Sequence, residues 1–144
     1  MKRVMLAAAV AVAGLATSAA AEKAKSLVTI LTAPEPQTQL MAMVLTMQSL
    51  KQGAEARVLL CGPAADLALK AAPASATAGQ PPKNMSPQGL MQKIAGHPNA
   101  KVEVCAIYLP GLGQGPEVLL DGVGVAKPGD MAAGILEADT TMSF

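Results

Sequence analysis

Positions 102–111 read Val-Glu-Val-Cys-Ala-Ile-Tyr-Leu-Pro-Gly, and this stretch decides the fold of the chain. Its Val and Ile residues are typical of a buried strand, which we predict over Lys101–Leu109, and Tyr108-Leu109-Pro110-Gly111 predicts a turn. Cys105 would then lie near the carboxyl end of a buried strand. In α/β folds this edge of the sheet is where ligands bind and chemistry occurs. Cys105 is therefore the first candidate for a functional residue.

Alternating strand and helix patterns extend outward from this segment. Further strands are predicted at 26–32, 56–61, 123–126 and 140–144, with helices at 37–51, 64–70, 87–95, 116–120 and 130–137, the last capped by Asp130. Strands that alternate with helices favour parallel pairing, because parallel strands need crossover connections. We therefore expect a three-layer α/β/α sandwich with a mostly parallel sheet of about five strands. Residues 71–83 are rich in Ala, Pro, Ser and Gly without periodicity, which predicts a mobile surface loop.

The N-terminus has the three-part pattern of a secretory signal peptide. Lys2 and Arg3 precede an apolar run over 4–16, and Ala19-Ala20-Ala21 ends the segment in small residues. The run is too short for a comfortable membrane span, so we expect cleavage after Ala21 and a periplasmic or secreted protein, with an uncleaved anchor as the alternative. The mature domain would be 22–144, without a further membrane segment.

Composition limits the partners of this mature domain. Removing residues 1–21 takes away Lys2 and Arg3 and no acid, which leaves nine Lys and Arg against ten Asp and Glu. A net charge near −1 argues against nucleic-acid or anionic-membrane partners. The remaining 123 residues are the usual size of one domain.

Other residues predicted at the same sheet edge are candidates for supporting roles. Cys61 ends the second strand, and a disulfide with Cys105 would require the two strands to be immediate neighbours. Strand order cannot be read from the sequence, and we favour two free thiols. Thr32 and Glu35 follow the first strand and would either shape a pocket or merely cap a helix.

The glycine-rich segment after Cys105 offers a means of activating a thiol. A working thiol must be present as a thiolate. The amides of Gly111–Gly115, Gly113 among them, would form a nest of N–H donors near the sulfur, and the helix beginning at Pro116 would add a partial positive charge. The alternative is that Cys105 is an inert buried residue.

No metal or cofactor site is predicted. Met41, Met43 and Met47 suggest a copper(I) site, but Met43 and Met47 fit the core stripe of the first helix, and core packing is favoured. His97 lies in a turn, and no His/Cys spacing suggests zinc. Gly111-x-Gly113-x-Gly115 lacks the spacing of a dinucleotide site.

Several motifs together resemble the DsrE/DsrF-like sulfur-relay family, particularly its exported single-domain members. The resemblance covers nearly the whole mature chain and rests on Leu31-Thr32, Val58-Leu59-Leu60-Cys61-Gly62, Ser86-Pro87-Gln88-Gly89-Leu90-Met91, Val102-Glu103-Val104-Cys105 with Gly113, Leu119-Leu120-Asp121-Gly122-Val123 and Thr141-Met142-Ser143-Phe144. It implies a sulfur carrier or sulfurtransferase-like protein that holds a persulfide on Cys105. It also implies a protein or small sulfur compound as donor or acceptor, and self-association as trimers or hexamers.

The sequence departs from this family at one position. Exported relatives often have Cys-x-x-Cys where this chain has Cys105-Ala106-Ile107-Tyr108, so a local dithiol is absent and a single-thiol carrier is expected. Two further function classes stay open. One is a non-catalytic module that binds a small ligand or a protein, and the other is a copper chaperone.

Overall fold

The computed structural model describes residues 24–144. Five strands form one sheet in the order β4-β3-β2-β1-β5, and every neighbouring pair is parallel. The strands are β1 (Ser26–Leu31), β2 (Glu55–Leu60), β3 (Ala100–Cys105), β4 (Val123–Ala126) and β5 (Thr140–Ser143). The α-helices are α1 (Pro36–Lys51), α2 (Ala74–Thr77), α3 (Pro87–Ala95), α4 (Tyr108–Leu112) and α5 (Pro128–Glu137), and η1 (Gly62–Ala68) and η2 (Pro116–Val118) are 3₁₀ turns.

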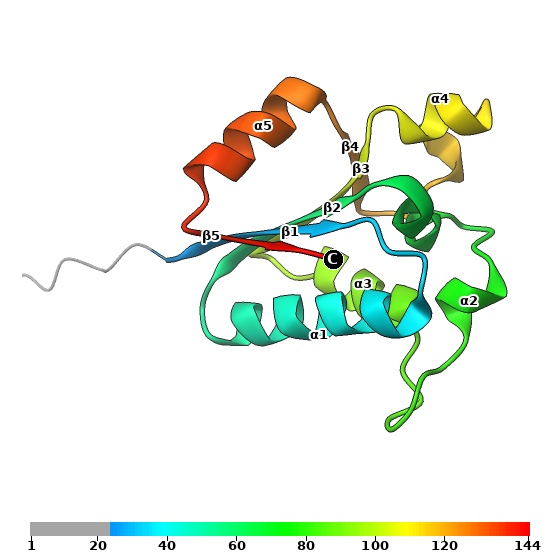
Figure 1. Ribbon diagram of the computed structural model, residues 1–144, viewed down its shortest axis with the longest axis horizontal. Coiled ribbons are helices and arrows are strands. Elements are labelled where there is room, and N and C mark those ends of the chain that lie inside the picture. The colour runs from blue at the N-terminus through cyan, green and yellow to red at the C-terminus, as the bar shows by residue number, and fades with distance from the viewer. Residues whose placement is uncertain (1–23) are drawn as a thin grey trace, which may run out of the picture.

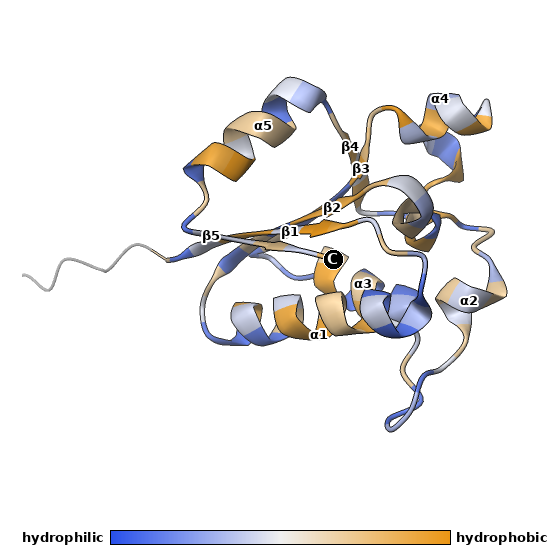
Figure 2. Cartoon of the chain, in the orientation of Figure 1, coloured by the Kyte–Doolittle hydropathy of each residue, from blue (hydrophilic) through white to orange (hydrophobic). Residues whose placement is uncertain are grey.

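The expected three-layer α/β architecture is confirmed. Figure 1 shows α1 and α3 on one face of the sheet, and α5 on the other. The central strands are mainly apolar, as the hydropathy colouring of Figure 2 shows, because helices cover both of their faces. Strands β2 and β3 each include two charged residues, Arg57 and Glu103 among them. The sheet is parallel throughout, so all the strands end at one edge.

Most of the core lies between the sheet and the pair α1 and α3. Leu31, Val58, Leu60 and Val104 meet Met43, Met91 and Ile94 there, and each of these side chains is fully buried. One polar pair is included, since the hydroxyls of Thr29 and Thr46 are 2.8 Å apart and hydrogen-bonded. This pairing avoids the cost of burying an unsatisfied hydroxyl.

The opposite face is covered more thinly. Helix α5 runs from edge strand β4 to the opposite edge strand β5, and its Met131 and Ile135 pack on Val28 and Leu59. A single helix therefore serves as the whole crossover on this side.

Several expected elements differ from the structure. Strand β3 ends at Cys105 instead of Leu109, because β4 ends at Ala126, opposite Cys105, and leaves no further pairing partner. The expected helices at 64–70 and 116–120 are 3₁₀ turns, and the predicted loop at 71–83 contains the one-turn helix α2. Helix α5 begins at Pro128 with Lys127 as its N-cap, so Asp130 lies in the first turn and is not the cap.

The predicted signal peptide and its cleavage point after Ala21 lie outside the described residues. Within residues 24–144, every helix is too short or too polar to span a bilayer.

Candidate functional site

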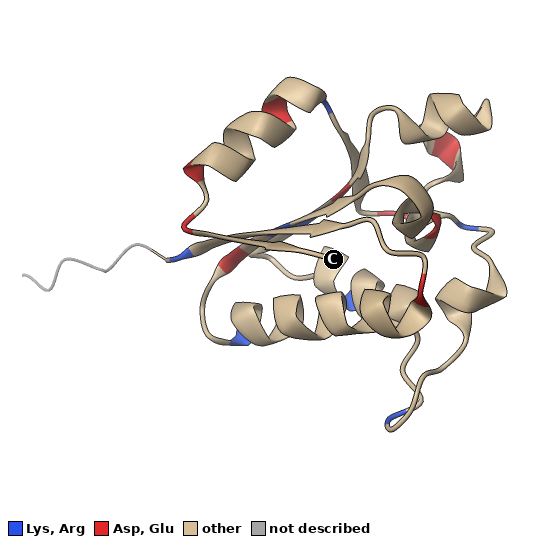
Figure 3. Cartoon of the chain, in the orientation of Figure 1, with Lys and Arg blue, Asp and Glu red and all other residues tan. Residues whose placement is uncertain are grey.

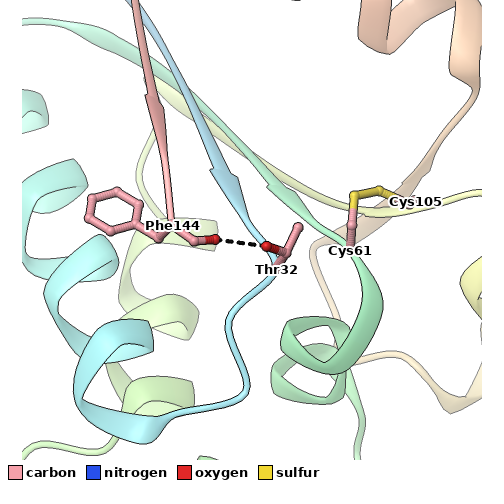
Figure 4. Close-up of a disulfide and its surroundings, with 4 residues drawn as sticks. All are labelled: Thr32, Cys61, Cys105 and Phe144. Atoms are coloured by element: carbon pink, nitrogen blue, oxygen red, sulfur yellow. Dashed lines mark hydrogen bonds between the residues drawn. A yellow bond between two sulfur atoms is a disulfide. The ribbon is translucent and has the colours of Figure 1, made fainter.

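Cys61 and Cys105 form a disulfide at the carboxyl edge of the sheet (Figure 4). Strands β2 and β3 are neighbours, and the pairing of Leu60 with Val104 places the next residues, the two cysteines, opposite each other. Their Cα atoms are 5.2 Å apart, within the range that a disulfide spans. The expectation of two free thiols is therefore wrong, because the strands that end at the two cysteines, β2 and β3, are immediate neighbours.

The two sulfur-bearing residues differ in exposure. Cys105 is buried, with 5% of its surface exposed, whereas Cys61 is partly exposed. Side chains two residues apart in a strand lie on the same face, and the cysteines are two residues after Leu59 and Glu103. Both cysteine side chains therefore lie on the face that α5 covers. An external nucleophile therefore has better access to Cys61 than to Cys105.

Tyr108 provides a second link between the two segments that follow the cysteines. It is the first residue of α4, and its hydroxyl donates a 2.6 Å hydrogen bond to the carboxylate of Asp66 in η1. Burial, the hydrogen bond to Asp66 and the negative charge of Asp66 together raise the pKa of Tyr108. Tyr108 is thus a neutral donor that holds α4 against η1, beside the disulfide that joins β2 to β3.

The glycine-rich segment does not form the expected nest of free amides. The N–H of Gly111 donates to the Ile107 carbonyl, that of Gly113 to Pro110, and that of Gly115 to the Glu117 carboxylate. Gly113 has a φ of 64°, a left-handed conformation suited to glycine, and it ends α4. These donors are used in building the turn. The helix expected at Pro116 is the three-residue turn η2, which is too short to act as a helix dipole.

Thr32 and Glu35 lie at the same edge of the sheet but have other partners. The Thr32 hydroxyl donates to the Phe144 carbonyl at 2.9 Å and so connects β1 with the residue that follows β5 (Figure 4). Glu35 is the exposed N-cap of α1, and its carbonyl accepts the Gln39 N–H. Thr32 therefore closes the edge between β1 and β5, whereas Glu35 occupies the N-cap position of α1 without a side-chain capping bond.

Two residues near the cysteines were missed from the sequence. Asp66 is found only through its bond to Tyr108, 42 residues away. Lys127 follows Ala126, the β4 partner of Cys105, so its backbone lies at the carboxyl edge of the sheet next to the end of β3. A correct strand order would have predicted the position of Lys127. Over residues 24–144, the other charged residues are scattered without a large cluster of one sign (Figure 3).

Three cavities lie elsewhere on the molecule. One of about 450 Å³ is near the amino ends of β1–β3 beside Arg57, and one of about 550 Å³ is near the start of β5. The third, of about 590 Å³, is a groove beside α1 that is bordered on its other side by residues from 80–85. Neither cysteine lines any of the three.

Packing and a local turn account for the positions of Met41, Met43, Met47 and His97. Met43 is fully buried in the core, as expected, and Met47 packs against the same core while it also lines the groove beside α1. Met41 is exposed and lines that groove. His97 accepts the Asn99 N–H through Nδ1 within its turn. In residues 24–144, no three His, Cys, Asp or Glu side chains gather as metal ligands would.

Comparison with known proteins extends to fold alone. No family model and no curated protein matches the chain. Among solved structures, the YchN protein of E. coli has a TM-score of 0.62 at 20% identity, over 85% of this chain and 100% of YchN. A protein of unknown function, MTH1491 from Methanobacterium thermoautotrophicum, has a TM-score of 0.60 at 12% identity over the same shares of the two chains. The chain therefore has the α/β fold of YchN.

Proposed function

We propose that this protein is an exported sulfur carrier of the DsrE/DsrF type that holds sulfane sulfur as a persulfide on Cys105. The observation that carries the proposal is the pairing of Cys105 with Cys61 at the carboxyl edge of the sheet. Similarity to the fold of YchN and the sequence resemblance support the family. The signal-like N-terminus supports an oxidising compartment, where such a disulfide persists.

The first step of the proposed cycle opens the disulfide. The thiolate of an external thiol attacks the Sγ of Cys61, the more exposed residue of the pair, and forms a mixed disulfide. The bond to Cys105 breaks, and its electron pair leaves on the Cys105 Sγ. A second external thiolate then releases Cys61. Two external thiols are oxidised to a disulfide. The Cys61–Cys105 disulfide takes up the two electrons and is reduced to two thiols.

The second step loads sulfur. The Cys105 thiolate attacks the terminal sulfur of a donor persulfide, so that a new S–S bond forms at Cys105 and the donor leaves as its thiolate. Delivery to an acceptor thiolate reverses this transfer. Without an acceptor, Cys61 attacks the Cys105 Sγ, expels hydrosulfide and restores the disulfide. Cys61 is thus a resolving thiol supplied by the neighbouring strand in place of the missing local Cys-x-x-Cys.

Intact mass tests this assignment. The reduced protein, Cys61→Ser and Cys105→Ser are each exposed to a polysulfide donor. We expect Cys61→Ser to gain and keep one sulfur atom, and the wild type to gain it transiently and return to the disulfide form with release of sulfide. Cys105→Ser should gain none. Full loading of Cys105→Ser would show that Cys105 is not the acceptor.

A second candidate function, a non-catalytic binding module of the same fold, is favoured by the groove beside α1. This groove of about 590 Å³ is lined mainly by apolar side chains, among them Leu40, Val44 and Met47, with Lys51 and Lys83 as its charged members. Its size and lining suit a small apolar ligand with an anionic group. Binding of anilinonaphthalene sulfonate that is lost in Val44→Asp and unchanged after alkylation of both cysteines would support this function. Absence of saturable binding would count against it.

A further inference from the structure

We propose that the surface around the disulfide docks a protein that carries a solvent-exposed dithiol, and that this partner, not a small thiol, opens the Cys61–Cys105 bond. This inference rests on the disulfide-opening step of the proposed function and names the partner for it. The docking surface consists of Pro63, Ile107, Pro110 and Leu112.

Exposed apolar side chains occupy equivalent positions beside both cysteines. Pro63 lies two residues after Cys61 and Ile107 two residues after Cys105, and both are exposed, Ile107 at 79%. Helix α4 adds Pro110 and Leu112, the latter 47% exposed. Single exposed apolar residues are ordinary on a soluble protein, but several in the segments that directly follow two bonded cysteines are a candidate interaction site.

The chemistry of the bond identifies the occupant as a thiol. Disulfide exchange requires a thiolate that approaches a sulfur, and Cys61 is the more exposed residue of the pair. The cysteines lie outside all three described cavities, so these offer no enclosure for a small thiol at the sulfur. A protein that covers Ile107 and Leu112 would gain the apolar burial that a small polar thiol cannot supply.

Charge favours the same conclusion. Glutathione is an anion and would be best held by several cations, whereas Lys127 is the cation that strand pairing brings to this edge beside Cys105. The nearby carboxylate of Asp66 is engaged by Tyr108. Within residues 24–144, strand pairing therefore brings no cluster of cations to this edge, as a small anionic thiol would require.

The exchange balances with the partner's two cysteines. One partner thiolate attacks the Cys61 Sγ, forming an intermolecular disulfide and releasing Cys105 as a thiolate. The second partner thiolate then attacks the partner sulfur that is bonded to Cys61. The partner's two cysteines form a disulfide, and Cys61 leaves as a thiolate. Two electrons pass from the partner to this protein. The Tyr108–Asp66 bond keeps η1 and α4 together while the covalent link is open.

Reduction kinetics test the proposal, with reduced thioredoxin as the protein dithiol and glutathione and dithiothreitol as small thiols. The variants are Ile107→Asp and, in case that one folds poorly, Leu112→Asp. Leu136→Asp is the matched control, because Leu136 is 86% exposed in the last turn of α5. That turn lies near the start of β5, at the opposite end of the sheet from the cysteines.

We expect thioredoxin to reduce the wild type faster than either small thiol at equal thiol concentration. Ile107→Asp or Leu112→Asp should slow thioredoxin about tenfold, the scale of losing a central interface contact. Both should leave the dithiothreitol rate unchanged, and Leu136→Asp should change neither. Equal slowing by both reductants, no slowing by either, or a change in oligomeric mass of Ile107→Asp would overturn the docking proposal.

Sulfur loading of the same variants separates the two proposals. Chemically reduced Ile107→Asp should still load one sulfur atom from polysulfide, because loading involves Cys105 and not the docking surface. Failure of loading in every variant with the thioredoxin effect intact would overturn the sulfur-carrier function alone. Normal loading without a thioredoxin effect would overturn the docking surface alone.

Discussion

At the residue scale, Tyr108 gives the site a titration signal that can be followed directly. It is the one tyrosine of the chain, and the chain has no tryptophan. Burial raises its pKa first, and the hydrogen bond and charge of Asp66 raise it further. The group is neutral below its ordinary pKa of about 10 in both folded and unfolded chains, so it affects the pH dependence of stability only above that value.

We predict that Tyr108 ionises at a much higher pH in the native protein than in the denatured protein. Ultraviolet absorbance of tyrosinate, followed in native buffer and in guanidinium chloride, measures the two titrations. The folded state holds the proton that the unfolded state loses above pH of about 10, so stability falls as pH rises past that point. Asp66→Asn should lower the native pKa only part of the way, because burial is the largest cause. A native titration that coincides with the denatured one would refute the part-buried, hydrogen-bonded position of Tyr108.

The cysteine pair shows which residue-scale facts a sequence can carry. Cys105 was placed at the end of a buried strand from the pattern of its own neighbours, and that placement is correct. Its bond to Cys61 depends on β2 and β3 being adjacent, which no local pattern encodes. The Tyr108–Asp66 bond joins residues 42 positions apart and was hidden for the same reason.

At the scale of elements, periodicity predicted the long segments and failed on the short ones. Helices α1 and α3 have clear helical spacing and ends near the expected residues. Helix α4 has only five residues, and the residues at its start, Ile107-Tyr108-Leu109, have a composition that favours a strand. It is a helix because β3 has run out of partners and because Leu109 is buried there.

Helix α5 is fixed to the sheet by an arginine that passes close to a glycine. The Arg57 Nε donates to buried Glu103 at 2.7 Å, and its Nη1 donates to the Asp130 carbonyl at 2.7 Å. Lys101 is the second cation on Glu103, at 2.8 Å. A Cβ added at Gly134 would lie 2.5 Å from the Arg57 Nη1, so alanine there would displace the guanidinium.

We predict that Gly134→Ala destabilises the wild type although alanine is the better helix former. In an Arg57→Ala background, the same change should stabilise by about 1 kcal/mol, the intrinsic preference of a helix for alanine. Urea unfolding of the two single variants and the double variant measures this coupling. Stabilisation by Gly134→Ala in both backgrounds would show that Arg57 does not depend on the glycine.

At the scale of the whole molecule, the proposed cycle requires that the protein stay folded when the disulfide is open. The bridge closes a sequence separation of 44 residues. By the chain-entropy account, such a loop is worth about 4 kcal/mol of stability. Small domains commonly have about 5–15 kcal/mol in total, so the reduced form is expected to remain folded but to be clearly weaker.

We therefore predict that dithiothreitol lowers the free energy of unfolding by about 4 kcal/mol and leaves the native circular dichroism spectrum unchanged. The core between the sheet, α1 and α3 does not include the cysteines, and the Tyr108–Asp66 bond still joins η1 to α4, so the fold has independent support. The Cys61→Ser, Cys105→Ser double variant is the control and should be insensitive to reductant. If reduction unfolds the wild type outright, the dithiol state cannot serve as an intermediate, and the bridge is a structural staple in a protein whose function lies elsewhere, with the groove beside α1 as the next site to test.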